Sequence, residues 1–227
     1  METGWTRGVV TVELLEPAGR ARGGVLVVHS WWGLTDSFRR YGAALAAEGY
    51  RVGLADLFGG ATATTEDEAR ALRAARRPRP DYRTLSAGLD AVRGAAADLP
   101  LATVGFSMGG HWAAWLAGRA AYGLSAAVLY YAARASHVDG RAGLLAHFAA
   151  ADPWVSASAR GGMERALHRA GRRYVAHDYP GTGHWFAESA RPDAYDPEAS
   201  MLALTRDIAF LSAHLDRATT GAGGDAG

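Results

Sequence analysis

Two reactive residue types are missing from this 227-residue sequence: it has no cysteine, and all 24 of its basic residues are arginines rather than lysines. The absence of cysteine excludes a disulfide, a thiolate nucleophile and a zinc site built on sulfur. The absence of lysine excludes Schiff-base chemistry on a lysine and a Walker-type phosphate loop. The net charge is only +1, which gives no reason to expect nucleic acid or an anionic membrane as a partner.

Long apolar runs are missing as well. No stretch reaches the ~18 consecutive apolar residues of a membrane-spanning helix. Residues 1–20 carry charges at Glu2, Arg7, Glu13 and Glu16 and lack the apolar core of a signal peptide. These absences predict a cytoplasmic protein that acts away from membranes.

What the sequence does contain is the composition of a globular protein with a sizeable core, with 49% hydrophobic and 21% charged residues. Its length fits one α/β domain, which we predict over residues 1–217. Residues 218–227 are rich in glycine, alanine and threonine without periodicity, so we predict a disordered tail there. A monomer and a homodimer are both compatible with this composition.

Short apolar runs alternate with amphipathic segments along the chain. The runs predict strands at residues 9–15, 24–29, 51–57, 101–104, 124–132, 142–149 and 173–179. The segments between them predict helices at residues 36–47, 66–76, 82–97, 111–117, 158–170 and from Pro197 onward. The apolar stripe of the last helix consists of Met201, Leu204, Ile208 and Leu211. This alternation predicts an α/β fold with a mainly parallel sheet and helices on both faces.

One stretch, Gly105-Phe106-Ser107-Met108-Gly109-Gly110, lies between a predicted strand and a predicted helix. It matches the G-x-S-x-G pattern of a nucleophile elbow, a turn so tight that flanking side chains would clash. Such a turn exposes the serine hydroxyl above the sheet, and the helix N-terminus behind it stabilises a developing oxyanion. The alternative is a glycine-rich turn that carries a serine by chance. The strand and the helix on the expected sides favour the elbow.

A serine nucleophile needs a general base, and the base needs an acid that orients it. In the chain order Ser–Asp–His, Asp152 follows the strand at 142–149 and His184 follows the strand at 173–179. Both come after C-terminal strand ends, where open α/β sheets place their sites. We therefore predict Ser107, Asp152 and His184 as catalytic residues. The less well placed alternatives are His137, His147, His168, His177 and His214 for the base, and Asp139, Asp178, Asp193 and Asp196 for the acid.

The residues near these strand ends predict an oxyanion hole and a pocket. The expected oxyanion donors are the backbone N–H groups of Trp31 and Met108. Five of the seven tryptophans adjoin motif residues, which indicates an aromatic mouth for an apolar or aromatic substrate. Ordinary packing would also explain Trp31 and Trp32. The predicted pocket residues are His29, Trp32, His111, Trp112, Trp154 and Trp185, with Tyr131 and Phe186 as possible additions.

Four segments together resemble the dienelactone hydrolase family, which has the α/β-hydrolase fold. They are residues 25–34, 105–110, 151–155 and 179–186, and the Tyr-Pro-Gly-x-Gly-His sequence in the last is the most family-specific. The resemblance implies hydrolysis of cyclic enol-lactones and related esters by a nucleophile–His–Asp triad, without a cofactor or a metal. Here that triad would be Ser107, His184 and Asp152.

Three positions depart from the family pattern. The best-known members have a cysteine nucleophile where this chain has Ser107, and a glutamate that manages the protonation of the thiol where it has Ser30. An arginine that holds the substrate carboxylate is replaced by Glu188. We therefore place Ser30 and Glu188 in the predicted pocket and expect a small neutral or aromatic ester or lactone as the substrate.

The sequence thus predicts a serine hydrolase that forms an acyl-enzyme on Ser107. The alternative is a protein of the same fold that acts as a lyase or cyclase, or binds a ligand without turnover, because a fold does not fix a function.

Overall fold

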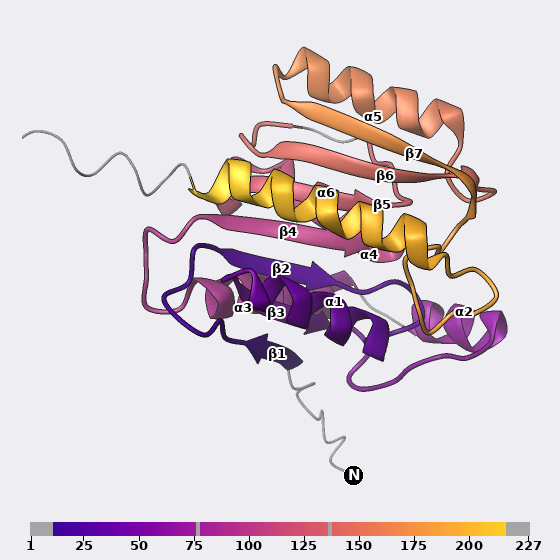
Figure 1. Ribbon diagram of the computed structural model, residues 1–227, viewed down its shortest axis with the longest axis horizontal. Coiled ribbons are helices and arrows are strands. Elements are labelled where there is room, and N and C mark those ends of the chain that lie inside the picture. The colour runs from indigo at the N-terminus through magenta and orange to yellow at the C-terminus, as the bar shows by residue number, and fades with distance from the viewer. Residues whose placement is uncertain (1–10, 76–77, 136–137, 217–227) are drawn as a thin grey trace, which may run out of the picture.

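A seven-stranded sheet forms the centre of the protein (Figure 1). The computed structural model describes residues 11–75, 78–135 and 138–216. The strands lie in the order β1-β3-β2-β4-β5-β6-β7, and all neighbouring pairs are parallel except β1 with β3. Their bounds are β1 Thr11–Leu15, β2 Gly24–Val28, β3 Arg51–Asp56, β4 Leu101–Phe106, β5 Leu124–Tyr130, β6 Gly143–Ala151 and β7 Tyr174–Gly183. The predicted α/β fold with a mainly parallel sheet is confirmed.

Helices cover both faces of the sheet. Alternate residues of β2 belong to two hydrophobic clusters, Val25 and Val27 to one and Leu26 and Val28 to the other, because successive side chains of a strand point to opposite faces. The first cluster includes residues of α1 (Asp36–Ala47), α2 (Glu66–Ala75) and α6 (Pro197–Leu215). The second includes residues of α3 (Pro78–Arg93), α4 (Met108–Ala117) and α5 (Ala157–Arg169). In Figure 1, α1 and α6 lie in front of the sheet. A short 3-10 helix, η1 (Ala120–Tyr122), precedes β5.

Helix α3 differs from the sequence prediction at both ends. It begins at Pro78, four residues before the predicted start, and it ends at Arg93 rather than at residue 97. Proline is tolerated in a first helical turn, because the backbone N–H that it lacks has no acceptor inside the helix. At the other end, Gly94 has φ +56° and lies directly after the last helical residue, a left-handed conformation that commonly ends helices.

The buried face of α6 is also rotated relative to the predicted stripe. Met201 is 68% exposed, whereas Ala203, Asp207, Leu211 and Leu215 are the buried positions. The prediction is therefore wrong for Met201. The apolar pattern did not reveal the buried face, because a polar residue, Asp207, occupies the middle of that face. Its carboxylate is hydrogen-bonded there to side chains of the core.

Strand β7 is longer than predicted and includes the Pro-Gly-Thr-Gly segment. Its last residue, Gly183, is paired with Ala151, the last residue of β6. Consequently Asp152 directly follows the end of β6, and His184 directly follows the end of the neighbouring parallel strand β7. The sheet register alone therefore brings the predicted acid and the predicted base side by side.

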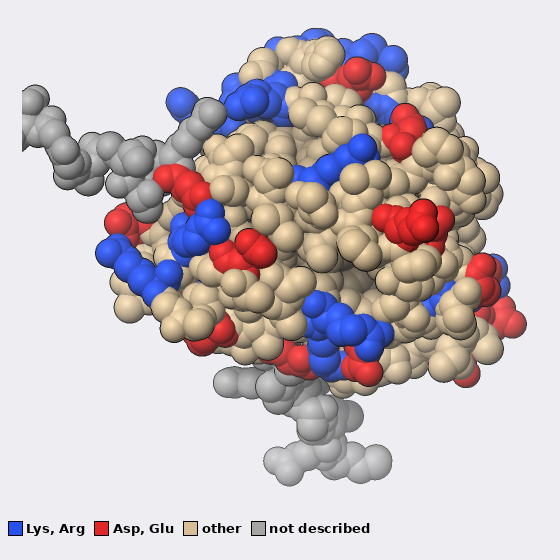
Figure 2. All heavy atoms as spheres, in the orientation of Figure 1, with Lys and Arg blue, Asp and Glu red and all other residues tan. Residues whose placement is uncertain are grey.

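In the described residues, no helix is both long and apolar enough to cross a membrane. Acidic and basic side chains are interspersed on the face shown in Figure 2. The predicted tail at residues 218–227, the start of the first predicted strand at residues 9–10, and His137 lie outside the described residues.

Candidate active site

The turn at Ser107 has the conformation of a nucleophile elbow. Ser107 follows β4 directly, and α4 begins at the next residue. Its φ is +51° and its ψ is −111°, a backbone conformation that costs a non-glycine residue about 1–3 kcal/mol. A Cβ atom at Gly105 would lie 2.2 Å from the carbonyl oxygen of Gly109, and one at Gly109 would lie 2.2 Å from that of Val28. Only glycine fits at these two positions, because the obstruction is backbone.

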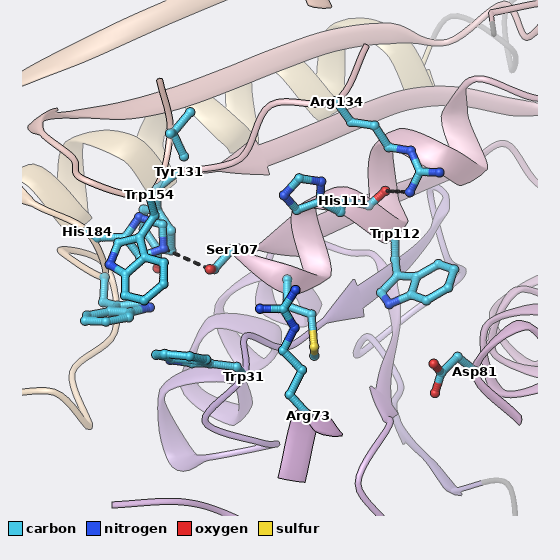
Figure 3. A pocket seen from close by; sticks show the side chains of 13 residues that line it. Trp31, Arg73, Asp81, Ser107, His111, Trp112, Tyr131, Arg134, Trp154 and His184 are labelled. Atoms are coloured by element: carbon cyan, nitrogen blue, oxygen red, sulfur yellow. Dashed lines mark hydrogen bonds between the residues drawn. The ribbon is translucent and has the colours of Figure 1, made fainter. Parts of the chain in front are cut away.

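The three predicted catalytic side chains are joined by hydrogen bonds, and Figure 3 shows the one between Ser107 and His184. Ser107 Oγ lies 2.8 Å from His184 Nε2, and His184 Nδ1 lies 2.9 and 2.8 Å from the two Asp152 oxygens. An ionised carboxylate only accepts, so Nδ1 carries the proton and Nε2 is free to accept from the serine hydroxyl. Asp152 Oδ1 also accepts from the backbone N–H groups of Trp154 and Val155, at 2.8 and 3.2 Å. These bonds fix the orientation of the carboxylate.

A cavity of about 500 Å³ opens beside Ser107. Of the predicted pocket residues, His111, Trp112, Trp154 and Trp185 line it, together with the two predicted oxyanion donors, Trp31 and Met108, and with Tyr131. The other described lining residues are Arg73, Asp81, Ser107, Arg134, Val155 and His184. A volume of this size suits a small organic ligand.

Tryptophan side chains form one wall of the cavity. The rings of Trp31 and Trp185 are stacked with their centroids 5.7 Å apart, and Trp154 meets Trp31 edge-on at 5.2 Å. Trp154 is 49% exposed and is the most accessible of the three. Trp32 packs under this wall, where it is 1% exposed, and the centroids of the Trp32 and Trp185 rings lie 5.2 Å apart.

Four predicted pocket residues, and Phe186, do not line the cavity. His29, Ser30, Trp32 and Glu188 are each at most 1% exposed and lie beneath the pocket wall, and Phe186 is fully buried. The ring nitrogens of His29 both meet backbone groups: Nδ1 lies 2.5 Å from the carbonyl oxygen of Ser30, and Nε2 accepts from the N–H of Leu57 at 3.0 Å. His29, Trp32 and Phe186 were predicted from their nearness in sequence to the motifs, and Ser30 and Glu188 from the family positions that they occupy. Neither kind of signal determines the side of the loop to which a side chain points.

Glu188 is held by two hydroxyl groups under the pocket wall. Its Oε2 accepts from Ser30 Oγ at 2.7 Å, and its Oε1 accepts from Tyr131 Oη at 2.8 Å. Burial raises the pKa of Glu188 to about 7, although the two hydrogen bonds and the nearby charge of Arg191 lower it. Burial and the neighbouring Glu188 together raise the pKa of Tyr131 well above its usual value.

Two arginines on the cavity were missed by the sequence analysis. Figure 3 shows Arg134 and Arg73 on opposite sides of His111, with Arg73 supplied by α2. Burial lowers the pKa of His111, and the charges of Arg134 and Arg73 lower it further. The side chain of His111 is therefore neutral near pH 7. No local pattern could have identified these arginines, because their role depends on where α2 and the segment after β5 pack.

Over the described ranges, no three histidine, aspartate or glutamate side chains are grouped as metal ligands. Of the alternative histidines, His147 is fully buried on β6, where Nε2 lies 2.7 Å from Asp207 and Nδ1 lies 2.7 Å from Tyr179 Oη. The alternative acid Asp178 is paired with Arg160.

Comparisons with known proteins bear on the fold and on the family of this chain. No curated protein sequence matches the chain. Among solved structures, m3DLH has a TM-score of 0.77 and 26% identity, with 89% of this chain and 92% of that chain covered. A dienelactone hydrolase-like promiscuous phosphotriesterase from metagenomic libraries has a TM-score of 0.76 and 22% identity, with the same coverage of both chains. Thermogutta terrifontis esterase 2, phosphorylated by paraoxon, has a TM-score of 0.64 and 17% identity, with 89% of this chain and 88% of that chain covered.

These neighbours share the α/β-hydrolase fold that the sequence predicted. The family model that matches is that of the dienelactone hydrolase family, and the match extends over residues 10–215. The resemblance recognised in the sequence is therefore confirmed. The chain belongs to the dienelactone hydrolase family.

Proposed function

We propose that the protein is a hydrolase of small carboxylic esters or lactones in which Ser107 is the nucleophile. The observation that carries this proposal is the continuous hydrogen-bonded series from Ser107 Oγ through His184 to Asp152, with the serine facing the cavity. Membership of a hydrolase family supports the reaction class.

The proposed reaction has two halves. Ser107 Oγ attacks the ester carbonyl carbon while His184 Nε2 accepts the hydroxyl proton, and Asp152 stabilises the imidazolium that forms. The N–H groups of Trp31 and Met108 stabilise the oxyanion. The carbon–oxygen ester bond then breaks, and His184 gives its proton to the leaving alcohol. Water attacks the acyl-enzyme by the same route, which yields the carboxylic acid and restores Ser107.

The walls of the cavity suggest the kind of substrate. The tryptophan wall supports an aromatic or apolar group next to the scissile carbonyl. The replacement of the family's arginine by Glu188 favoured a neutral substrate. Arg73 and Arg134, however, bring positive charge to the cavity away from the tryptophan wall. We propose a neutral aryl ester or an aromatic lactone as the preferred class, and a matched anionic ester is the comparison that tests it. We place this reaction in the cytoplasm, as the sequence predicts.

The proposal is tested by covalent labelling together with turnover. Wild type, Ser107→Ala and His184→Ala are treated with a fluorophosphonate probe and weighed intact, and hydrolysis of phenyl acetate is measured alongside. We expect one adduct on the wild type, and a fall in turnover of at least ~10⁴-fold in both variants. Ser158→Ala, which changes an exposed serine of α5, is the matched control and should behave as wild type.

Two results would point elsewhere. Turnover that persists in Ser107→Ala would contradict the nucleophile. A labelled serine without hydrolysis of any ester would favour the lyase, the cyclase or the ligand-binding protein as the function. Because one structural neighbour is a promiscuous phosphotriesterase, paraoxon is included as a second substrate in the same assay.

A further inference from the structure

A buried carboxylate with neutral partners lies directly behind the catalytic side chains. Glu188 is 1% exposed, and its two oxygens accept from the hydroxyls of Ser30 and Tyr131. Burying a carboxylate is unfavourable unless its hydrogen bonds are made, and an apolar side chain would fill the same space without that cost. The presence of a carboxyl group at this buried position therefore needs an explanation beyond packing.

The first hydroxyl belongs to the loop that carries the predicted oxyanion donor. Ser30 follows β2, and its Oγ accepts from the backbone N–H of Trp32 at 3.3 Å. The carbonyl oxygen of Ser30 accepts from the N–H of Gly33 at 3.3 Å. These two bonds close a turn around Trp31, whose N–H is the predicted donor. Because Glu188 fixes Ser30 Oγ, it also restrains this turn.

The second hydroxyl belongs to the wall against which His184 rests. The ring of Tyr131 lies 4.8 Å from the imidazole ring of His184, centroid to centroid. Tyr131 has φ +38°, and its N–H donates to the carbonyl oxygen of His147 at 2.7 Å. A non-glycine residue in this region is held there by its surroundings. The bond from Tyr131 Oη to Glu188 fixes the ring at its far end.

Glu188 itself lies in a loop that is anchored at both ends. Its backbone N–H donates to the carbonyl oxygen of Trp185 at 2.9 Å, and its own carbonyl oxygen accepts from the backbone N–H of Arg191 at 2.8 Å. Ser37 Oγ of α1 accepts from the N–H of Ala190 at 2.7 Å. The carboxylate is thus carried by a rigid segment, which is what a positioning group requires.

We propose that Glu188 is a positioning residue that links the oxyanion loop to the wall behind the catalytic histidine. One carboxylate then sets the Trp31 N–H and the His184 imidazole relative to Ser107 Oγ. This inference rests on the proposed function of Ser107. It assigns Glu188 no contact with the substrate, which agrees with its burial beneath the cavity wall.

The test compares Glu188→Gln with variants that each remove one hydroxyl, Ser30→Ala and Tyr131→Phe. Steady-state hydrolysis of phenyl acetate gives kcat and KM separately. Glu188→Gln should lower kcat by ~10–100-fold, because misplaced catalytic groups and oxyanion donors have effects of this size. KM should change by less than about threefold, because the substrate does not touch the carboxylate. Each hydroxyl variant should show the same pattern with a smaller fall in kcat.

The double variant gives a second readout, because two substitutions that merely loosened the structure independently would each lower kcat. If Tyr131 acts through Glu188, adding Tyr131→Phe to Glu188→Gln should lower kcat little further. The matched control is Asp207→Asn, which changes another buried carboxylate that accepts from two tyrosine hydroxyls, those of Tyr41 and Tyr130. Its kcat should stay within about twofold of wild type below its unfolding transition, since it lies away from the cavity.

The outcomes separate the two proposals. A wild-type enzyme that is labelled and active, with kcat in Glu188→Gln within about twofold of wild type, would overturn the positioning role and leave the proposed function intact. A wild type that forms no adduct on Ser107 would contradict the proposed function. It would contradict this inference as well, because the inference rests on that function. If Glu188→Gln does not fold, the two hydroxyl variants decide, because unchanged kcat in both would also overturn the inference.

Discussion

Two of the histidine–aspartate pairs in the described part of the chain look alike but lie in different surroundings. In each, an imidazole lies between a carboxylate and a hydroxyl: His184 between Asp152 and Ser107, and His147 between Asp207 and Tyr179. The hydrogen-bond distances from ring to hydroxyl are 2.8 and 2.7 Å. The rings are used in opposite senses. Nδ1 faces the carboxylate in the first pair, and Nε2 faces it in the second.

The surroundings separate the two pairs. The hydroxyl of the first pair sits on a strained turn beside a cavity of about 500 Å³. The second pair is fully buried, and its carboxylate also accepts from Tyr41 and Tyr130. Burial and the Asp207 carboxylate raise the pKa values of both these tyrosines well above their usual range. The two pairs thus share residue types and differ in access to a cavity and in their position in the sheet. On the proposed function, these two properties make the first pair reactive and leave the second structural.

In the buried pair, the aspartate joins separate layers of the fold. Asp207 belongs to α6, Tyr130 to β5, His147 to β6 and Tyr41 to α1. The hydrogen bonds therefore hold α6 on the sheet at one particular rotation. Substitutions in the first pair should therefore lower kcat, whereas substitutions in the buried pair should lower the free energy of unfolding.

The largest expected effect is on catalysis, at Asp152. Asp152→Asn should lower kcat by ~10⁴-fold, because an asparagine favours the wrong imidazole tautomer for accepting the serine proton. The equivalent change in the buried pair, Asp207→Asn, should leave kcat nearly unchanged. Steady-state kinetics on both variants, at a temperature where circular dichroism shows them folded, would make this comparison. Equal losses of kcat would show that the two pairs are functionally coupled.

The next effect is on stability, at His147. His147→Ala leaves a buried carboxylate without its imidazole partner, which should lower the free energy of unfolding by about 3–5 kcal/mol. His184→Ala should lower it by less than about 1 kcal/mol, because Asp152 still accepts from the backbone N–H groups of Trp154 and Val155 when the imidazole is removed. Urea denaturation monitored by tryptophan fluorescence gives both numbers. Tyr179→Phe removes only one hydroxyl and should lower stability by about 1 kcal/mol.

The smallest effect concerns the pH dependence of stability, through Glu188. Its pKa is raised to about 7 in the folded protein, while a glutamate in an unfolded chain titrates near about 4.3. Between these values the folded state keeps a proton that the unfolded state has released. The contribution of Glu188 to stability is therefore present below the lower pKa and is lost as the pH rises through the higher one.

Glu188→Gln removes this titration. The difference in free energy of unfolding between this variant and wild type should shift in favour of the variant by about 3 kcal/mol from about pH 4 to about pH 8. Urea unfolding of both proteins at several pH values would measure the difference. A difference that stays flat with pH would show that the carboxyl titrates in its ordinary range.

The sequence was informative wherever function depends on strand ends. Ser107, Asp152 and His184 could be predicted because each follows a recognisable strand, and strands of a parallel sheet end at a common edge. The pairing of Ala151 with Gly183 then brings the second and third of these residues together. Their catalytic role is still a prediction, which the labelling experiment addresses.

The sequence was uninformative wherever the site depends on how helices and loops pack. Arg73 reaches the cavity from α2, and nothing in the local pattern indicates that this helix lies over the site. Asp207 lies on the buried face of a helix whose apolar residues suggested another face. Ser30 and Glu188 were predicted to line the pocket, but their side chains meet each other beneath it. All of these depend on contacts between distant parts of the chain.

The close backbone contacts at Gly105 and Gly109 have a consequence for interpreting related sequences. A side chain at either position would collide with main-chain oxygen atoms, and no rotamer change can relieve such a collision. A descendant that had lost Ser107 and all catalysis would still have to keep both glycines in order to fold. Glycines kept at both positions therefore identify only the shape of the turn, and on the proposed function an active copy is distinguished from an inactive one by the residues at positions 107, 152 and 184.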